Sequence, residues 1–348
     1  MAQDEIKEFD INQIPEPENI SDVIYNLMVN PNLSLINYFN DFSESIPDPK
    51  GLNNDLSSEA GIIELEDGSK IVTMSTHALH HHLEQDPKKA AEILVTRAVR
   101  KMICFGATPI ALTAMLYHIN YSDPNGNFLA SGAKAGLEEA AEAFGLKIAD
   151  RKIRFDNFEE HDSQSPTLII SIMGTLKADK KKVVKTMDPN FKSKGNNIFL
   201  MGRTSDDIAT SDYLEYYHGI TSSPLPEFDL KFEVKLLKTV KELIEQNLVE
   251  SAGPVGKGGL FFSLLRAGWA NELGFDITTA AENRIDSFLF GESMGRIIVG
   301  VEPGFEEDFV DFVYDSKIPF FMLGHVTKGE IRIDDESLGY IDKMSTAV

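Results

Sequence analysis

Apolar and polar residues recur along this chain with two periods, one near 3.6 residues and one of 2 residues. The clearest helical pattern follows Asp86-Pro87, which combine an aspartate N-cap with a proline in the first turn. This segment reads KKAAEILVTRAVRKMICF and ends at Gly106, and the segment SGAKAGLEEAAEAF ends in the same way at Gly145. Two helices are therefore predicted, each closed by a glycine.

Strands are predicted where β-branched and aromatic residues alternate with polar ones. GIIEL and KIVTMS flank Asp67-Gly68 as a hairpin, and three further strands read PIALTAMLYHI, LKIADRKIRF and TLIISIMGTL. A second β/α unit begins at NNIFLMG and continues through long helical segments near 229–249 and 259–272. The order predicts an α/β (α+β) protein with an N-terminal arm over 1–20, a β-rich domain over 21–185 and a C-terminal α/β domain over 195–348.

Composition sets limits on the class of protein. The chain has 348 residues, of which 42% are hydrophobic, and this supports two domains with sizeable cores. No apolar run reaches the about 18 residues that a membrane helix needs, and the acidic start MAQDEIKEFD does not resemble a signal peptide. A net charge of −22 opposes binding to nucleic acid or to anionic lipid. Cys104 is the only cysteine, which excludes an intrachain disulfide and a cysteine metal cage. We expect a cytoplasmic protein with no nucleic-acid or membrane partner.

One glycine-rich loop could bind an anion. Gly256, Lys257, Gly258 and Gly259 precede a predicted helix, so backbone N–H groups, the helix dipole and a lysine charge would meet there. The spacing is not that of a P-loop. The alternative is a flexible loop that leads into a buried helix.

Two other groups of residues are candidates. His77, His80, His81 and His82 suggest a metal site, although neighbouring histidines are more often an exposed segment. Arg97 and Lys101 lie one turn apart on the predicted helix opposite its apolar face, with Arg100 beside them. They could clamp a phosphate or simply form a solvated surface.

Several ordered motifs resemble the aminoimidazole ribonucleotide synthetase superfamily, most closely the second synthetase-like half of phosphoribosylformylglycinamidine synthase. In the N-terminal part these are NLMVNPNLSLINYFNDF and the stretch from STHALHHHLEQDP through AAEILVTRAVRKMICFGATPIAL. In the C-terminal part they are SDYLEYYHG, LVESAGPVGKGGLFFSLLRAG and LFGESMGRIIVGV. The resemblance covers about residues 24 to 326.

The resemblance implies two domains whose N-terminal sheets pair in a homodimer or with another synthetase-like chain. It also implies MgATP binding, with activation of an amide oxygen by phosphorylation. In the synthase, ammonia then converts formylglycinamide ribonucleotide to its amidine, and the ammonia can come from a separate glutaminase chain.

Departures from the family pattern fall on the residues that would hold magnesium and ATP. Glu59 stands in place of an aspartate, and His77 stands where Thr-x-Asp is expected, as a candidate catalytic residue. Arg97 and Lys101 replace a glutamate and an asparagine, and Asp150-Arg151 replaces Gly-Asn. Both aspartates of the acidic loop are lost, and Lys257 replaces one of them. The residual metal candidates are Glu59, Asp156 and Asn157, and the phosphate or nucleotide candidates are Arg97, Lys101, Arg151 and the loop 256–259.

Mg²⁺ prefers oxygen ligands, and each cation placed beside it in a low-dielectric cleft is unfavourable. Three functions follow as alternatives. The first is a catalytically degenerate subunit with a structural or regulatory role in purine biosynthesis. The second is an active ATP-dependent ligase with an unusual or partner-completed site. The third is a metal-independent binder of a phosphate or nucleotide.

Overall fold

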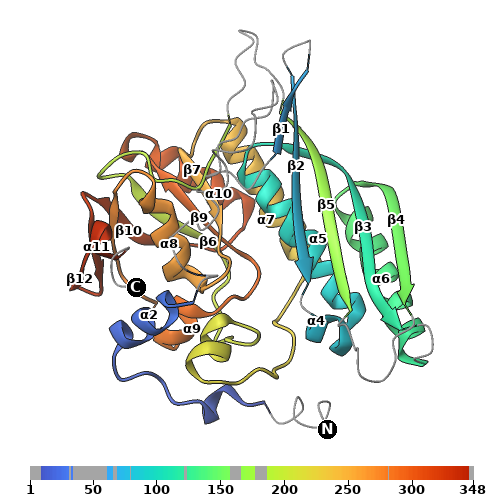
Figure 1. Cartoon of the computed structure of the whole chain (residues 1–348). Coiled ribbons are helices and arrows are strands. Elements are labelled where there is room, and N and C mark those ends of the chain that lie inside the picture. Colours follow the sequence, from blue (N-terminus) through green and yellow to red (C-terminus); the bar gives the residue numbers. More distant parts are fainter. Residues whose placement is uncertain are drawn as a thin grey trace, which may run out of the picture. The chain divides into compact units, whose positions relative to one another are not determined.

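The computed structural model divides into two compact units, each with its own sheet (Figure 1). It describes residues 9–30, 33, 61–65, 69–78, 80–120, 124–156, 166–176, 186–280 and 282–344. The first unit takes in most of the N-terminal half together with residues 228–234, and the second takes in the rest of the C-terminal half together with the first helix. The chain is a mixed α/β protein with two sheets, as the sequence predicts.

The N-terminal unit is built on a five-stranded sheet of order β1-β2-β5-β3-β4. All pairs are antiparallel except β3 and β4, which run parallel. The strands are β1 (Gly61–Glu64), β2 (Lys70–Ala78), β3 (Thr108–Asn120), β4 (Lys147–Asp156) and β5 (Thr167–Leu176). The helices are α4 (His80–Gln85), α5 (Pro87–Cys104) and α6 (Pro124–Ala143). The predicted hairpin and strands are confirmed, whereas α6 begins seven residues earlier than the predicted SGAKAGLEEAAEAF segment.

Helix α5 follows the sequence signals closely. The Asp86 side chain accepts a hydrogen bond from the Lys89 amide, and Pro87 occupies the first turn. One face of the sheet lies against α5, because Thr76 of β2 donates to the Leu94 carbonyl and a Cβ at Gly174 of β5 would meet the Met102 sulfur. The helical pattern therefore predicts both the start and the buried face of α5.

The opposite side of α5 is less exposed than its charges suggest. Arg100, at 2% exposure, lies with its Nε 3.9 Å from Oε2 of Glu233, which is 1% exposed. Glu233 comes from residues 228–234, which pack in the same unit. The interpretation of Arg100 as part of a solvated surface is thus wrong. One turn further along, burial raises the pKa of the Cys104 thiol to about 12.

The C-terminal unit is built on a seven-stranded sheet of order β12-β11-β8-β10-β6-β9-β7. Its strands are β6 (Asn197–Gly202), β7 (Ser251–Pro254), β8 (Gly274–Ile277), β9 (Arg296–Val301), β10 (Phe320–Thr327), β11 (Glu330–Ile333) and β12 (Glu336–Tyr340). The helical elements are η1 (Ile11–Gln13), α2 (Ile20–Met28), η2 (Tyr213–Tyr217), α7 (Leu230–Glu245), α8 (Gly259–Trp269), α9 (Ile285–Phe290), η3 (Pro303–Phe305), α10 (Glu306–Ser316) and α11 (Ile341–Met344). The first five residues of α7 belong to the N-terminal unit.

Strands β6 and β9 lie at the centre of this core and are buried along their whole length. On one face, residues of α2, α8 and α9 join a single hydrophobic cluster with the sheet. On the other face, Phe309 of α10 packs on Phe199 with ring centroids 4.7 Å apart. The predicted boundaries placed residues from 21 onward in the N-terminal domain, whereas α2 buries Val23, Ile24, Leu27 and Met28 in the C-terminal core.

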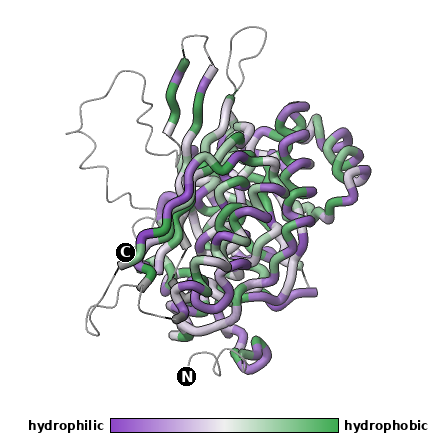
Figure 2. The backbone as a smooth tube through the Cα atoms, turned by 90° about the vertical axis from the view of Figure 1, so that its right-hand side faces the viewer, coloured by the Kyte–Doolittle hydropathy of each residue, from purple (hydrophilic) through white to green (hydrophobic). Residues whose placement is uncertain are grey.

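Hydrophobic and hydrophilic residues alternate along most helices and strands, as Figure 2 shows. This mixed pattern is typical of elements that bury one face only. Within the described ranges, no helix combines the length and the apolar character needed to cross a bilayer.

Candidate functional site

Three segments distant in sequence bring one lysine and two carboxylates together in the C-terminal unit. Lys257 Nζ lies 2.6 Å from Asp212 Oδ1 and 3.6 Å from Glu292 Oε2. The Asp212 and Glu292 side chains are 4% and 3% exposed, whereas that of Lys257 is 44% exposed. We call these three residues the lysine–carboxylate cluster. Its carboxylates are enclosed by protein, and its ammonium is the member that solvent reaches.

Backbone amides complete the cluster. Glu292 Oε1 accepts hydrogen bonds from the amides of Asp212 and Gly258, both at 2.9 Å. The Gly256 amide donates to Ser263 Oγ at 3.1 Å, and the Gly259 amide donates to the Gly256 carbonyl at 2.9 Å. The sequence led us to expect free amides in this loop, but those of its three glycines are engaged within the protein.

The electrostatics of the cluster follow from burial. Removal from water raises the pKa of Glu292, nearby Lys257 lowers it, and the Asp212 charge raises it again, with a net upward shift. The Lys257 ammonium is thus already paired with two carboxylates, and this pairing weakens its attraction for an anion.

Asp212 is positioned by the π-helix η2, a rare geometry that is frequent at functional sites. The next residue, Tyr213, is fully buried and donates its hydroxyl to Asp286 Oδ2 at 3.0 Å. Arg284 donates two hydrogen bonds to the same carboxylate, from Nε to Oδ1 at 3.1 Å and from Nη2 to Oδ2 at 2.7 Å. Burial raises the pKa of Tyr213 and lowers that of His218, which meets the Tyr213 ring edge-on. This second network fixes η2 against α9.

The LFGES segment is held by a buried arginine. Arg296 is 1% exposed and donates to the carbonyls of Phe288 and Gly291 at the end of α9. Gly259 has a φ of 74°, and a Cβ there would come within 2.6 Å of the Phe290 backbone. A side chain at this position would therefore push the glycine loop away from Glu292.

The described residues of this cluster do not fit a magnesium ion. A divalent cation would have to share Asp212 and Glu292 with an ammonium already 2.6 Å from one of them. Elsewhere, no group of three or more His, Cys, Asp or Glu residues in the described part of the chain is arranged to hold a metal ion.

The N-terminal candidates lie in the other unit. Arg97 and Lys101 are half-buried on α5, and Arg151 is exposed on β4 and pairs with Glu138 of α6. His77 lies in β2 opposite Ile169 of β5, and Asp156 ends β4 opposite Asn120. For these two residues the structure describes the backbone and not the side chain. Glu59 and Asn157 fall outside the described residues.

The sequence did not single out Asp212 or Glu292 as site residues. Both occur in motifs that it did bring out, SDYLEYYHG and LFGES. Their spacing from Lys257, 45 and 35 residues, gives no local pattern, so only the fold shows that the three meet.

Comparison with known proteins identifies both halves of the chain. The N-terminal domain of the AIR synthase related proteins matches residues 57–176, and the C-terminal domain of the same family matches residues 193–335. The phosphoribosylformylglycinamidine synthase subunit PurL of Alkaliphilus metalliredigens is 27% identical over 348 residues, covering 98% of this chain and 46% of the relative. The chain thus spans about half the length of the curated relatives it matches.

Solved structures share the fold. PurL from Thermotoga maritima complexed with FGAR has a TM-score of 0.72 at 15% identity, over 94% of this chain and 54% of that one. The same protein complexed with ADP has a TM-score of 0.70 at 15% identity, over 96% and 53% of the two chains. A chain of the HypE–HypF complex has a TM-score of 0.64 at 16% identity, over 86% and 97%. With both domains matched in order, the chain belongs to the family of AIR synthase related proteins.

Proposed function

We propose that this chain is a non-catalytic, PurL-like subunit with a structural or regulatory role in purine biosynthesis. The observation that carries the proposal is the place of Lys257. Its ammonium lies between two buried carboxylates, where a bound cation would otherwise neutralise them. Lys257 of the C-terminal loop therefore supplies the positive charge that a bound cation would otherwise provide.

Two further features support this role. The glycine-loop amides donate to Glu292, Ser263 and Gly256, so they are not aimed at a ligand. The Lys257 ammonium is also already paired with Asp212 and Glu292, which weakens its attraction for the phosphates of ATP and of formylglycinamide ribonucleotide. The same pairing disfavours the third alternative, a metal-independent phosphate binder at this loop. As a protein of nucleotide metabolism, the chain is expected in the cytoplasm.

We further propose that the N-terminal sheet pairs with a second synthetase-like sheet, from another copy or from a related chain. On the face turned from α5, Ser75 and Ser171 lie with their Oγ atoms 2.8 Å apart, and Met173 is 41% exposed. Thr73 and Thr113 belong to the same face by strand register. A flat face of small polar and aliphatic side chains suits the packing of one sheet on another.

Calorimetric titration with ATP, with and without Mg²⁺, tests the loss of catalysis, together with an assay of amidine formation from formylglycinamide ribonucleotide, ATP and ammonia. We expect no binding heat and no product from the chain alone, while an active PurL assayed in parallel gives both. Magnesium-dependent binding in the micromolar range would contradict the proposal. Binding of ATP without magnesium would favour the phosphate-binding alternative.

An active ATP-dependent ligase remains the second candidate, because PurL structures with FGAR and with ADP share the fold over at least 94% of this chain. In that case a partner chain would complete the site, so product would form only when a second synthetase-like chain and an ammonia source are added. The same mixture without this chain is the control.

Sedimentation velocity tests the pairing. We expect a dimer at micromolar concentration and a monomer for Met173→Lys, which puts a charge on the open sheet face. Ala135→Lys, on an exposed position of α6, is the matched control and should sediment as the unchanged chain does. A monomeric parent chain that also fails to join a PurL-type chain would contradict the pairing.

A further inference from the structure

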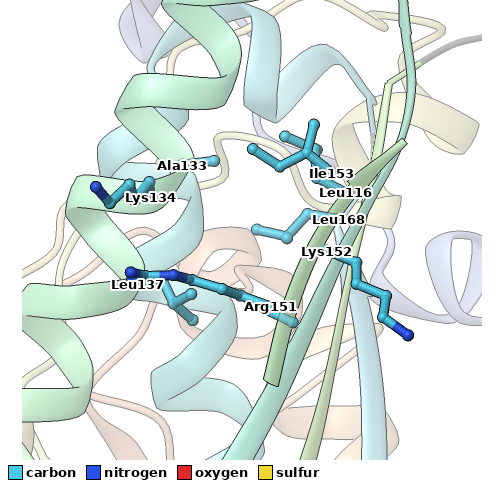
Figure 3. A pocket seen from close by; sticks show the side chains of 9 residues that line it. Leu116, Ala133, Lys134, Leu137, Arg151, Lys152, Ile153 and Leu168 are labelled. Carbon is cyan, nitrogen blue, oxygen red and sulfur yellow. The ribbon is translucent and has the colours of Figure 1, made fainter. Parts of the chain in front are cut away.

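Helix α6 leaves a cavity between itself and the sheet of the N-terminal unit. On one side α6 is pressed against the start of α5, because Gly132 and Gly136 have no Cβ there; a Cβ would come within 2.4 Å of the Pro87 side chain and 2.0 Å of the Lys88 carbonyl oxygen. On the side of β3 and β4 the helix makes less contact, and a cavity of about 340 Å³ remains that is half open to solvent (Figure 3). This volume lies at the lower end of the range for small-molecule sites.

The cavity has aliphatic walls. Its apolar lining residues come from β3, α6, β4 and β5, and they are Ala114, Leu116, Ala133, Leu137, Ile153 and Leu168. All but Ile153 are buried in the protein, and Ile153 is 44% exposed. Such walls suit a hydrocarbon chain and offer no side-chain partner for the polar edge of a nucleotide base.

The remaining lining residues are all cationic. They are Lys134 of α6 and Arg151 and Lys152 of β4, in a chain whose net charge is −22. In Figure 3 the Arg151 side chain reaches from β4 towards α6, where it pairs with Glu138, whereas Lys152 points to the other side of the sheet. A guanidinium has five N–H donors, so Arg151 can bind Glu138 and a second carboxylate together.

We propose that this cavity binds a small amphipathic carboxylate, with its hydrocarbon tail between α6 and the sheet. The carboxylate head is held at the edge of the cavity by Arg151, since the Lys134 ammonium points away from the sheet in Figure 3. The site lies apart from the lysine–carboxylate cluster, in the other unit, and does not depend on the function proposed above. It gives the chain a ligand whose chemistry differs from that of any nucleotide.

Calorimetric titration of the full chain with sodium octanoate tests the tail site. Ala133→Leu fills the cavity from a buried position on α6, and we expect it to weaken octanoate binding about tenfold or more, since each displaced methylene loses about a factor of four. Ala135→Leu, the same change at an exposed position of α6, is the matched control and should bind as the parent does. Equal binding by Ala133→Leu and the parent, or no binding by the parent up to about 10 mM, overturns the proposal.

A second pair of variants tests the head site. Arg151→Gln should weaken octanoate binding by about threefold to tenfold, because it removes a charge-assisted hydrogen bond. Lys152→Gln should leave it unchanged, since that side chain points away from the cavity. Octanol, with the same tail and no charge, should bind more weakly than octanoate. If octanol binds as tightly, the assignment of an anion is overturned.

Discussion

The two units each bury a group of charges, and the two groups are built differently. In the N-terminal unit, Arg100 Nε and Glu233 Oε2 lie 3.9 Å apart, and both side chains are at most 2% exposed. In the C-terminal unit, Lys257 is 44% exposed above two buried carboxylates, and backbone amides hold Glu292 in place. The first pair is enclosed, and the second group opens to solvent through its cation.

This difference separates a purely structural charge pair from a remodelled site. An enclosed pair stabilises the fold only while both partners are present, because removing one takes away a nearby opposite charge from a buried group. In the lysine–carboxylate cluster, the member that neutralises the carboxylates can be replaced by water or by ions from solution. The consequences of removing a cation should therefore be larger in the N-terminal unit than in the C-terminal one.

Arg100→Met should produce the largest loss of stability. It removes the guanidinium that lies 3.9 Å from the buried Glu233 carboxylate, and we expect the free energy of unfolding of the N-terminal unit to fall by about 3–5 kcal/mol. Urea unfolding followed by circular dichroism measures the change. The double variant Arg100→Met/Glu233→Leu should recover most of it. A single variant within about 1 kcal/mol of the parent would show that the pair is not isolated from water.

Lys257→Met should have a smaller effect. Glu292 can take up a proton and solvent reaches the position of the ammonium, so we expect a loss of about 1–2 kcal/mol in the C-terminal unit. Lys192→Met is the matched control, because Lys192 pairs with Asp188 on the surface at 2.7 Å, and it should cost less than about 0.5 kcal/mol. Equal losses for the two lysines would remove the distinction between the cluster and a surface pair.

The pKa of Glu292 gives a pH test of the same cluster. Burial raises it above the value in the unfolded chain, so the folded state holds the proton more tightly. The free energy of unfolding therefore falls as the pH rises from about 4.3 through the folded-state pKa of Glu292. Below about pH 4.3 Glu292 is protonated in both states, so it causes no such loss. Glu292→Gln should gain stability relative to the parent over this rise in pH. A difference between the two proteins that stays constant with pH would contradict the shift.

Arg151→Gln should change stability least. Arg151 and Glu138 join β4 to α6 with side chains 51% and 44% exposed, and exposed pairs contribute about 0.2–1 kcal/mol. We expect a loss near the lower end of that range, and 1 M NaCl should remove it by screening. A loss above about 2 kcal/mol would show that this exposed pair contributes as much stability as the buried charges do, which would contradict the comparison.

The parts of the fold that were predicted correctly depend mostly on local sequence signals, such as capping residues and the spacing of apolar residues. Asp86, Pro87 and Gly106 mark the start and end of α5 because capping acts within a few residues. Arg100 is an exception to this local reasoning. Its position on the helix predicts a solvent-exposed side chain, whereas residues 228–234 cover it. The π-helix η2, the strand β7 and the final hairpin β11–β12 are short elements that the hydrophobic pattern does not reveal.

The candidate site was predictable only in part. The glycine loop and Lys257 are adjacent in sequence, and their chemistry could be proposed from that alone. Their partners Asp212 and Glu292 come from distant segments, and whether a lysine binds a phosphate or neutralises its own protein depends on those partners. The charge of the cluster therefore follows from tertiary packing and not from the loop.

The burial of Cys104 makes the reaction rate of its thiol a measure of how often the N-terminal unit opens. Its thiol is 3% exposed and its pKa of about 12 keeps it protonated, so an alkylating reagent can react only when the N-terminal unit opens. Trp269, the single tryptophan, lies in α8 of the C-terminal unit. Alkylation rates and tryptophan fluorescence can thus time the opening of each unit separately in the unmodified chain.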